Sequence, residues 1–160
     1  MNLPGGKLLI KQEVAKNIDL EKMFYDLFDK EFSGYVASTT FVEEGFVEGF
    51  LTFKKGLLLG ALFYHRGLNK QTYGKKALEY VFNILLDEKS IVDVSELGVE
   101  QADLMLVFNQ KLLVSPPINK KTILPLLRKS YNKELFSNLS KEKEEDSQNI
   151  ISKIKFFIEG

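Results

Sequence analysis

Residues 35–64 read YVASTTFVEEGFVEGFLTFKKGLLLGALFY. Three runs rich in β-branched and aromatic residues are separated by short turns that end in Gly45 and Gly56; the runs are 35–42, 46–53 and 57–64. Runs of this length joined by glycine-bearing turns are typical of consecutive antiparallel strands. The stretch therefore predicts a three-stranded antiparallel meander at the centre of the fold.

The third run, Leu57 to Tyr64, is apolar on both faces of the strand that it predicts. We expect such a strand to be central and covered on both sides, or covered by a helix on one side and a partner on the other. Gly60 and Ala61 lie in its middle, and a glycine inside a strand usually marks the close approach of another backbone. Residues 7–14 and 90–94 also have the composition of strands.

Helices are expected before and after the meander in the sequence. Asp19 can accept the free amides of a first turn, and an amphipathic helix is predicted after it. Its apolar residues recur at three- and four-residue spacing: Leu20, Met23, Phe24, Leu27, Phe28 and Phe32. Thr72 and Ser95 are candidate N-caps of two more helices, over 73–87 and from Leu97 onward. Ser115-Pro116-Pro117 predicts a stop, and Pro125 a break in a short helix over 118–131.

The end of the chain changes in composition. Residues 140–149 carry charged side chains and no large apolar one, and an apolar stripe at helical spacing follows them. The stripe consists of Ile150, Ile151, Ile154, Phe157 and Ile158. We interpret it as an amphipathic helix that docks on its own domain, on a second copy or on a partner, since so apolar a stripe left bare would be sticky.

We therefore expect two regions in this 160-residue chain. Residues 1–130 form an α+β domain, with an antiparallel sheet of about four strands and helices packed on it. Residues 131–160 form the charged segment and the C-terminal helix. The start of the chain lacks a basic segment followed by a long apolar core, and the longest apolar run is too short to span a membrane. A cytoplasmic protein without membrane contact is the expectation.

Composition excludes several kinds of site. The chain has no cysteine and one histidine, which rules out disulfides, thiol nucleophiles, iron–sulfur clusters and multi-histidine metal sites. The acidic pairs Glu43-Glu44, Asp87-Glu88 and Asp93 with Glu96 fall in predicted turns or at a helix start, where capping and hydration explain them. We expect no metal and no cofactor.

No catalytic motif is present either. The sequence contains no phosphate-binding loop, no dinucleotide fingerprint and no nucleophile elbow. Basic residues (22) balance acidic residues (22), and no pattern of aromatic and basic residues on adjacent strands is visible, so nucleic-acid binding is disfavoured. No residue is therefore assigned a catalytic role.

One polar cluster could bind a ligand. Tyr64, His65 and Arg66 lie at a strand end, and Tyr73 lies across the following loop. His65 could act near neutral pH, Arg66 could grip a phosphate or carboxylate, and Tyr73 could add a stacking face. The plainer interpretation, which we favour, is a strand end whose polar tips are solvated.

The first two thirds of the chain contain several short segments of glycines and apolar residues in a particular order and spacing. The segments are Leu3-Pro4-Gly5-Gly6-Lys7, Phe32-Ser33-Gly34-Tyr35, residues 48–56, Gly60-Ala61, Gly74-Lys75-Lys76-Ala77-Leu78 and residues 92–97. In the order and spacing of these segments, the chain resembles a family of uncharacterised archaeal proteins. More distantly, it is similar to the PATAN-type domains found beside bacterial response regulators. The second resemblance implies an adaptor in signalling, and neither carries over a catalytic residue.

Taken together, these patterns favour a non-enzymatic protein-interaction or adaptor module that assembles with itself or with another protein. The alternative is a regulatory domain that binds a small molecule or nucleotide through the loop from Tyr64 to Tyr73. A nucleic-acid-associated protein is the second alternative.

Overall fold

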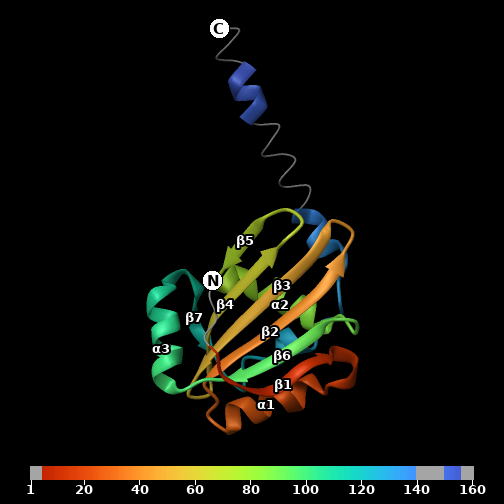
Figure 1. The fold of residues 1–160 in the computed structure, drawn as a ribbon. Coiled ribbons are helices and arrows are strands. Elements are labelled where there is room, and N and C mark those ends of the chain that lie inside the picture. Colours follow the sequence, from red (N-terminus) through yellow and green to blue (C-terminus); the bar gives the residue numbers. More distant parts are fainter. Residues whose placement is uncertain (1–4, 140–149, 156–160) are drawn as a thin grey trace.

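The computed structural model describes residues 5–139 and 150–155. Within them the fold is α+β, with seven strands in one sheet of order β1-β6-β2-β3-β4-β5 and with β7 beside β4 (Figure 1). The strands are β1 (Lys7–Val14), β2 (Gly34–Val42), β3 (Gly45–Lys54), β4 (Leu57–His65), β5 (Lys70–Tyr73), β6 (Ile91–Glu96) and β7 (Leu113–Ile118). The helices are α1 (Leu20–Asp29), α2 (Lys75–Leu86), α3 (Val99–Phe108) and α4 (Leu124–Leu127), with 3₁₀ helices η1 (Ala15–Asn17) and η2 (Gln110–Leu112). Residues 134–139 and 150–155 are also helical.

The predicted meander is confirmed. β2 pairs with β3 without interruption from Gly34↔Phe53 to Val42↔Gly45, and β3 pairs with β4 with one irregularity beside Thr52. Each strand pairing in the described residues is antiparallel. The meander thus supplies the middle of the sheet, and β6 joins it to the edge strand β1.

The expected count of about four strands is wrong. β5 has four residues and falls in the predicted loop from Tyr64 to Tyr73, yet its backbone pairs with β4 from Leu62↔Tyr73 to His65↔Lys70. β7 contains Pro116 and Pro117, which were predicted to be a stop. It pairs with β4 at two described positions, Leu58↔Ile118 and Gly60↔Leu113. Prolines are tolerated there because an edge strand can leave its outward amides unused.

Two helix starts also differ from the sequence prediction. Thr72 belongs to β5, and Gly74, at φ +68°, precedes α2 in its place. Ser95 belongs to β6, and α3 begins after Gly98, whose amide donates to the Gln101 side chain at 3.1 Å. In both cases the residue that local propensity favours as a helix cap is instead part of a paired strand. Pro125 lies in the first turn of α4, where it needs no hydrogen-bond partner, rather than breaking a helix.

The sheet has two unlike faces. Its first face carries α1, α2 and α4, and the alternate residues of β2 and β3 that point to it are buried. Gly49 lies on this face, where an added Cβ would come within 2.8 Å of Val81, so glycine lets α2 approach the sheet. The second face carries α3 at one end only: a Cβ on Gly60 would lie 3.1 Å from Leu106 and 3.3 Å from Leu112. Side chains, rather than the backbone that we expected, make the close approach at Gly60.

The core on the first face is built around Phe53 of β3. Its ring lies 6.2 Å from that of Phe24, 5.8 Å from that of Phe28 and 5.7 Å from that of Phe32. The Phe53 side chain is fully buried. Aromatic rings at these separations combine a large buried area with favourable ring contacts. The helical residues before β2 are therefore held directly on the central strand.

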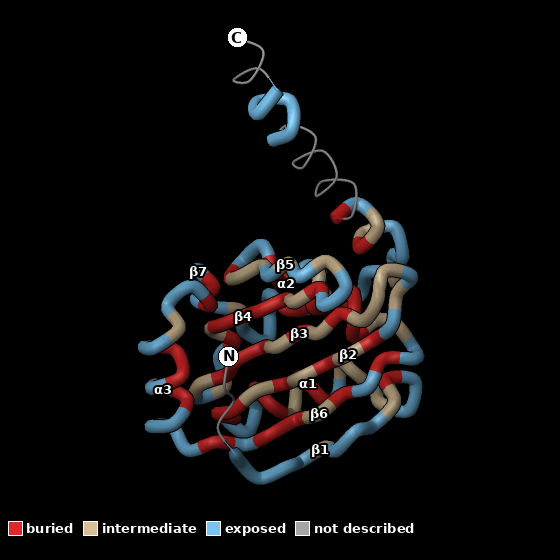
Figure 2. The backbone as a smooth tube through the Cα atoms, turned by 45° about the horizontal axis from the view of Figure 1, so that its top comes forward, coloured by how far each residue is buried: buried red, intermediate tan, exposed pale blue. Residues whose placement is uncertain are grey.

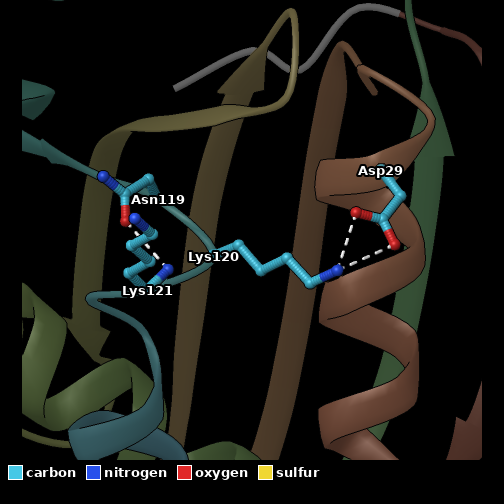
Figure 3. Close-up of polar contacts among 4 residues, drawn as sticks. All are labelled: Asp29, Asn119, Lys120 and Lys121. Atoms are coloured by element: carbon cyan, nitrogen blue, oxygen red, sulfur yellow. Dashed lines mark hydrogen bonds and ion pairs between the residues drawn. The ribbon is translucent and has the colours of Figure 1, made fainter.

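Segments after β7 return to the helices of the first face. Lys120 Nζ lies 2.9 Å and 3.1 Å from the two carboxylate oxygens of Asp29 at the end of α1 (Figure 3). The neighbouring Lys121 amide donates to the Asn119 side chain, which shapes the turn. Arg128 Nε reaches Glu21 at 3.2 Å. These ion pairs are solvent-exposed and contribute little stability each, but they fix the path of the chain over α1.

The domain continues past residue 130. Asn83 of α2 donates to the Asn132 carbonyl and accepts from its amide, both at 2.8 Å. Phe136 stacks on Phe63 of β4 with ring centres 5.7 Å apart, and Leu139 is buried. Residues 131–139, which we had grouped with the C-terminal segment, thus pack against the core. In the described part of the chain, no helix has both the length and the apolar character to cross a bilayer.

Replacing Phe53 with alanine should lower the free energy of unfolding by about 3–5 kcal/mol, because the cavity would lie where three other rings converge. Phe41→Ala is the matched control, since that ring is 80% exposed and its loss should change stability by about 0.5 kcal/mol or less. Urea denaturation of both variants measures the difference. Equal losses would contradict this account of the core.

Candidate functional site

Strand alternation divides the predicted ligand-binding residues between the two faces of the sheet. Tyr64 is paired with Glu48, and His65 with Val47, so their side chains point in opposite directions. Tyr64 and Arg66 lie on the second face, and Tyr73 lies there too, opposite Leu62. His65 lies on the first face, inside the core. The structure therefore brings Tyr64, Arg66 and Tyr73 to one face and separates His65 from them.

His65 is fully buried. Its Nδ1 accepts a hydrogen bond from the Leu68 amide at 3.2 Å, which closes the turn between β4 and β5. A buried ring that holds a turn in this way has a structural role. Its place in the core could have been inferred from the two-residue period of β4, because the residue next to a surface tyrosine on a strand must face the other side.

The Arg66 guanidinium is held by its neighbours. It lies 4.4 Å from the centre of the Tyr64 ring, and its Nε and Nη2 atoms lie 3.1 Å and 3.0 Å from the Glu48 carboxylate. Tyr64 donates to the Asn69 side chain at 2.6 Å. Stacking and ion pairing thus fix Arg66 flat against the sheet, and an anionic ligand would have to compete with Glu48 for it.

Aromatic residues do share one face of the sheet, contrary to the absence inferred from the sequence. We call this surface the aromatic face; it consists of Tyr35, Phe41, Phe46, Phe50, Tyr64 and Tyr73. Most of these side chains are half-buried, while Phe41 is 80% exposed. Lys111 lies 5.7 Å from the ring of Tyr73. This arrangement could not be inferred from the sequence, because the six residues lie on four strands. They come together on one face only through the register of strand pairing.

The acidic pair Asp87-Glu88 has a local structural explanation. Asp87 accepts from Thr40 Oγ1 at 2.6 Å and from the Lys89 amide at 3.0 Å, so both of its oxygens are used. Burial raises the pKa of the nearby Tyr131 hydroxyl, and the negative charge of Asp87 adds to the effect. Within the described residues, no three acidic or histidine side chains are grouped closely enough to hold a metal ion.

α3 exposes apolar side chains on a second side of the helix. Its inner side buries Ala102, Met105 and Leu106. Its outer side exposes Leu104 (55%), Val107 (61%) and Phe108 (80%), which lie three and four residues apart and so form one stripe. We call these three residues the α3 patch. A helix that is apolar all round is normally buried, so the run DLMLVF was the available signal that α3 has a second apolar side.

The predicted tail stripe is partly described. Ile150, Ile151 and Ile154 lie in the helical residues 150–155, where their exposed fractions are 58%, 52% and 52%. Phe157 and Ile158 lie outside the described residues. Figure 1 shows the short helix standing apart from the body of the domain. The α3 patch and the tail stripe thus both expose apolar side chains, as do Leu8 and Leu9 of β1 and Phe41 of β2.

Comparison with known proteins gives one match. A family model described as an uncharacterised protein conserved in archaea (DUF2226) matches residues 1–109. Those residues run from the start of the chain to the end of α3. No curated protein and no solved structure matches. The more distant similarity to PATAN-type domains therefore stays a prediction.

His65→Ala should lower the free energy of unfolding by about 1–3 kcal/mol, because it removes a buried acceptor and leaves a cavity behind β4. Arg66→Ala, which truncates the neighbouring surface side chain, should cost no more than about 1 kcal/mol. Thermal or urea unfolding of the two variants provides the comparison. A neutral His65→Ala would contradict the structural role assigned to this ring.

Proposed function

Since the chain belongs to this family of uncharacterised proteins conserved in archaea, whose model covers residues 1–109, we propose its function from its surfaces: a non-enzymatic protein-interaction module that associates with a second copy of itself. The observation that carries the proposal is the α3 patch. Leu104, Val107 and Phe108 place three large apolar side chains in water on one rigid helix. Contiguous exposed apolar surface of this kind is typical of interaction sites.

A second copy is the occupant that the charges of α3 favour. Glu100 and Asp103 lie in the first half of the helix, and Lys111 follows its end in η2. If two α3 helices pack antiparallel about a two-fold axis, Leu104 of each faces Phe108 of the other, as a self-complementary interface requires. The same arrangement places Lys111 beside the partner's Glu100, and it opposes the two helix dipoles favourably.

The positions of the flanking groups support this geometry. Asp103 is already paired with Lys54 of β3, which leaves Glu100, an exposed residue of the first turn, to face the second copy. α3 itself is held on the sheet by Met105 and Leu106, so the patch is presented without rearrangement. A preorganised surface loses little conformational entropy on binding.

Ligand binding through the loop from Tyr64 to Tyr73 is less well supported. His65 is buried away from the loop surface, and the Arg66 guanidinium is paired with Glu48. The aromatic face could in principle stack nucleic-acid bases, but Glu48 offsets the charge of Arg66 and the whole chain has no net charge. We therefore rank the small-molecule and nucleic-acid alternatives below self-association.

Phe108→Lys combined with Val107→Lys should raise the dimer dissociation constant at least tenfold, about 1.4 kcal/mol, because four lysines would meet across the two-fold axis. Size-exclusion chromatography with multi-angle light scattering over a dilution series measures this. Phe41→Lys is the control, since it adds a lysine at an equally exposed apolar position elsewhere. A wild-type chain that stays monomeric at all concentrations, or equal weakening by the control, would overturn the proposal.

Charge reversal tests the antiparallel arrangement. Lys111→Glu alone should weaken association several-fold by placing two acidic groups together, and Glu100→Lys added to it should restore most of the loss. Analytical ultracentrifugation of wild type, single and double variants gives the four dissociation constants of the cycle. Additive effects in the double variant would show that the two residues do not meet.

A further inference from the structure

Most exposed apolar side chains of the domain lie at one end of the sheet, which we call the α3 end. Leu8 of β1 and Leu113 of β7 are both level with Thr52 of β3 through the register of the intervening strands. Leu57 of β4 pairs with Lys54, and α3 is tied to Lys54 by an ion pair. In the described residues, the α3 end holds these large exposed apolar side chains: Leu8, Leu9, Leu57, Val99, Leu104, Val107, Phe108 and Leu113.

The opposite end of the sheet exposes Phe41 (80%) and Ile91 (37%) among the described residues of the domain. Ile91 pairs with Thr39, two residues before Phe41, so the two apolar side chains are diagonal neighbours on the second face. The Phe41 ring is backed by that of Phe46, with ring centres 6.0 Å apart. We call Phe41, Phe46 and Ile91 the Phe41 patch. It is separated from the apolar side chains of the α3 end by most of the length of the strands.

The last part of the domain lies at the same end of the sheet as the Phe41 patch. Lys133 Nζ lies 3.8 Å from the carboxylate of Glu43, which is in the turn directly after β2. Phe136 then stacks on Phe63 of β4, two strands away from β2, and Leu139 is buried. The tail therefore leaves the domain close to this patch.

The length of the connection favours the Phe41 patch over the α3 end. Residues 140–149 can span about 33 Å. Two strand spacings from β4 to β2 are about 10 Å, and passing from the first face to the second adds about 10 Å. The α3 end lies a further strand length away, since β3 has ten residues and is about 33 Å long. A tethered group has its highest effective concentration at sites that the tether reaches without being stretched.

The tail helix presents a stripe that suits an apolar patch. Ile150, Ile151 and Ile154 fall within one arc of about 100° at 100° per residue, so they form a single stripe. Figure 2 shows residues 150–155 exposed along their whole length. Lys153 and Lys155 flank the stripe on its two sides, so both can stay in water when the stripe is covered. Contact between stripe and patch removes apolar surface from water on each side.

We propose that residues 150–155 fold back in cis onto the Phe41 patch, with the isoleucine stripe against the Phe41 ring and Ile91. The docked helix covers the end of the aromatic face next to the β2–β3 turn and leaves the α3 patch open. The contact is made within one chain and uses other residues than self-association through α3, so it does not need a second copy.

Disulfide trapping tests the contact in the full chain, which has no cysteine of its own. Thr39→Cys places one thiol beside Ile91 on the patch, and Lys155→Cys places the other beside the stripe. Mild diamide oxidation should close the intramolecular disulfide at least tenfold faster in this variant than in the same variant with Ile150→Ala, Ile151→Ala and Ile154→Ala. Alanine preserves the tether and the helix but removes the apolar contact, so an undocked tail would react at the same rate in both. Non-reducing gels with peptide mapping identify the product.

Two further substitutions in the same cysteine variant locate the docking site. Phe41→Ser should slow trapping several-fold, whereas Leu8→Ser, at an exposed leucine of the α3 end, should leave the rate unchanged. High dilution with Val107→Lys and Phe108→Lys also present keeps the measurement independent of self-association, and circular dichroism confirms that each variant is folded. Equal rates with and without the isoleucines, equal slowing by Leu8→Ser, or a cross-link found only between two chains would overturn the proposal.

Discussion

The rest of the structure depends on how the Phe53 ring is enclosed. It sits on the central strand β3, and three phenylalanines that belong to α1 and the residues after it close around it. Phe24 also contacts Phe82 of α2, with ring centres 5.5 Å apart, so the same cluster joins both helices to the sheet. Burial of these rings fixes which face of the meander becomes the core. Once that choice is made, strand alternation assigns every other side chain of β2, β3 and β4 to a face.

The opposite face receives less cover, and this asymmetry produces the surfaces discussed above. α3 covers only the end of the face around Gly60, which leaves half-buried aromatic rings over the remainder. Ion pairing and stacking, as at Arg66, make that remainder compatible with water. α3 itself has apolar side chains on both sides, and only one side is used by the sheet. Exposed apolar side chains thus remain on α3 and on the tail, besides those on the edge strand β1 and at Phe41.

Much of this fold could be predicted from the sequence, because local signals and tertiary structure agree over residues 7–65. The meander and α1 have the periods of a sheet and an amphipathic helix, and Asp19 caps α1 as expected, accepting from the Lys22 amide at 3.1 Å. β5 and β7 could not be predicted, since their strand character comes from pairing with β4 and not from their own composition. For the site, proximity in sequence was misleading: Tyr64 and His65 are neighbours in the chain but lie on opposite faces. The α3 patch requires knowledge of which side of that helix the sheet covers.

The positions of the two unpartnered apolar surfaces have a consequence for how the module can work. The α3 patch lies beside the Lys54 end of β3, whereas the last part of the domain before the tail lies at the other end, where Lys133 meets Glu43. Occupants of the two surfaces do not compete for the same residues. Between them lie the sheet and the Phe53 cluster, whose rings are closely packed and buried. Association through α3 and contacts made by the tail stripe are therefore expected to be separable events, because the two surfaces use different residues.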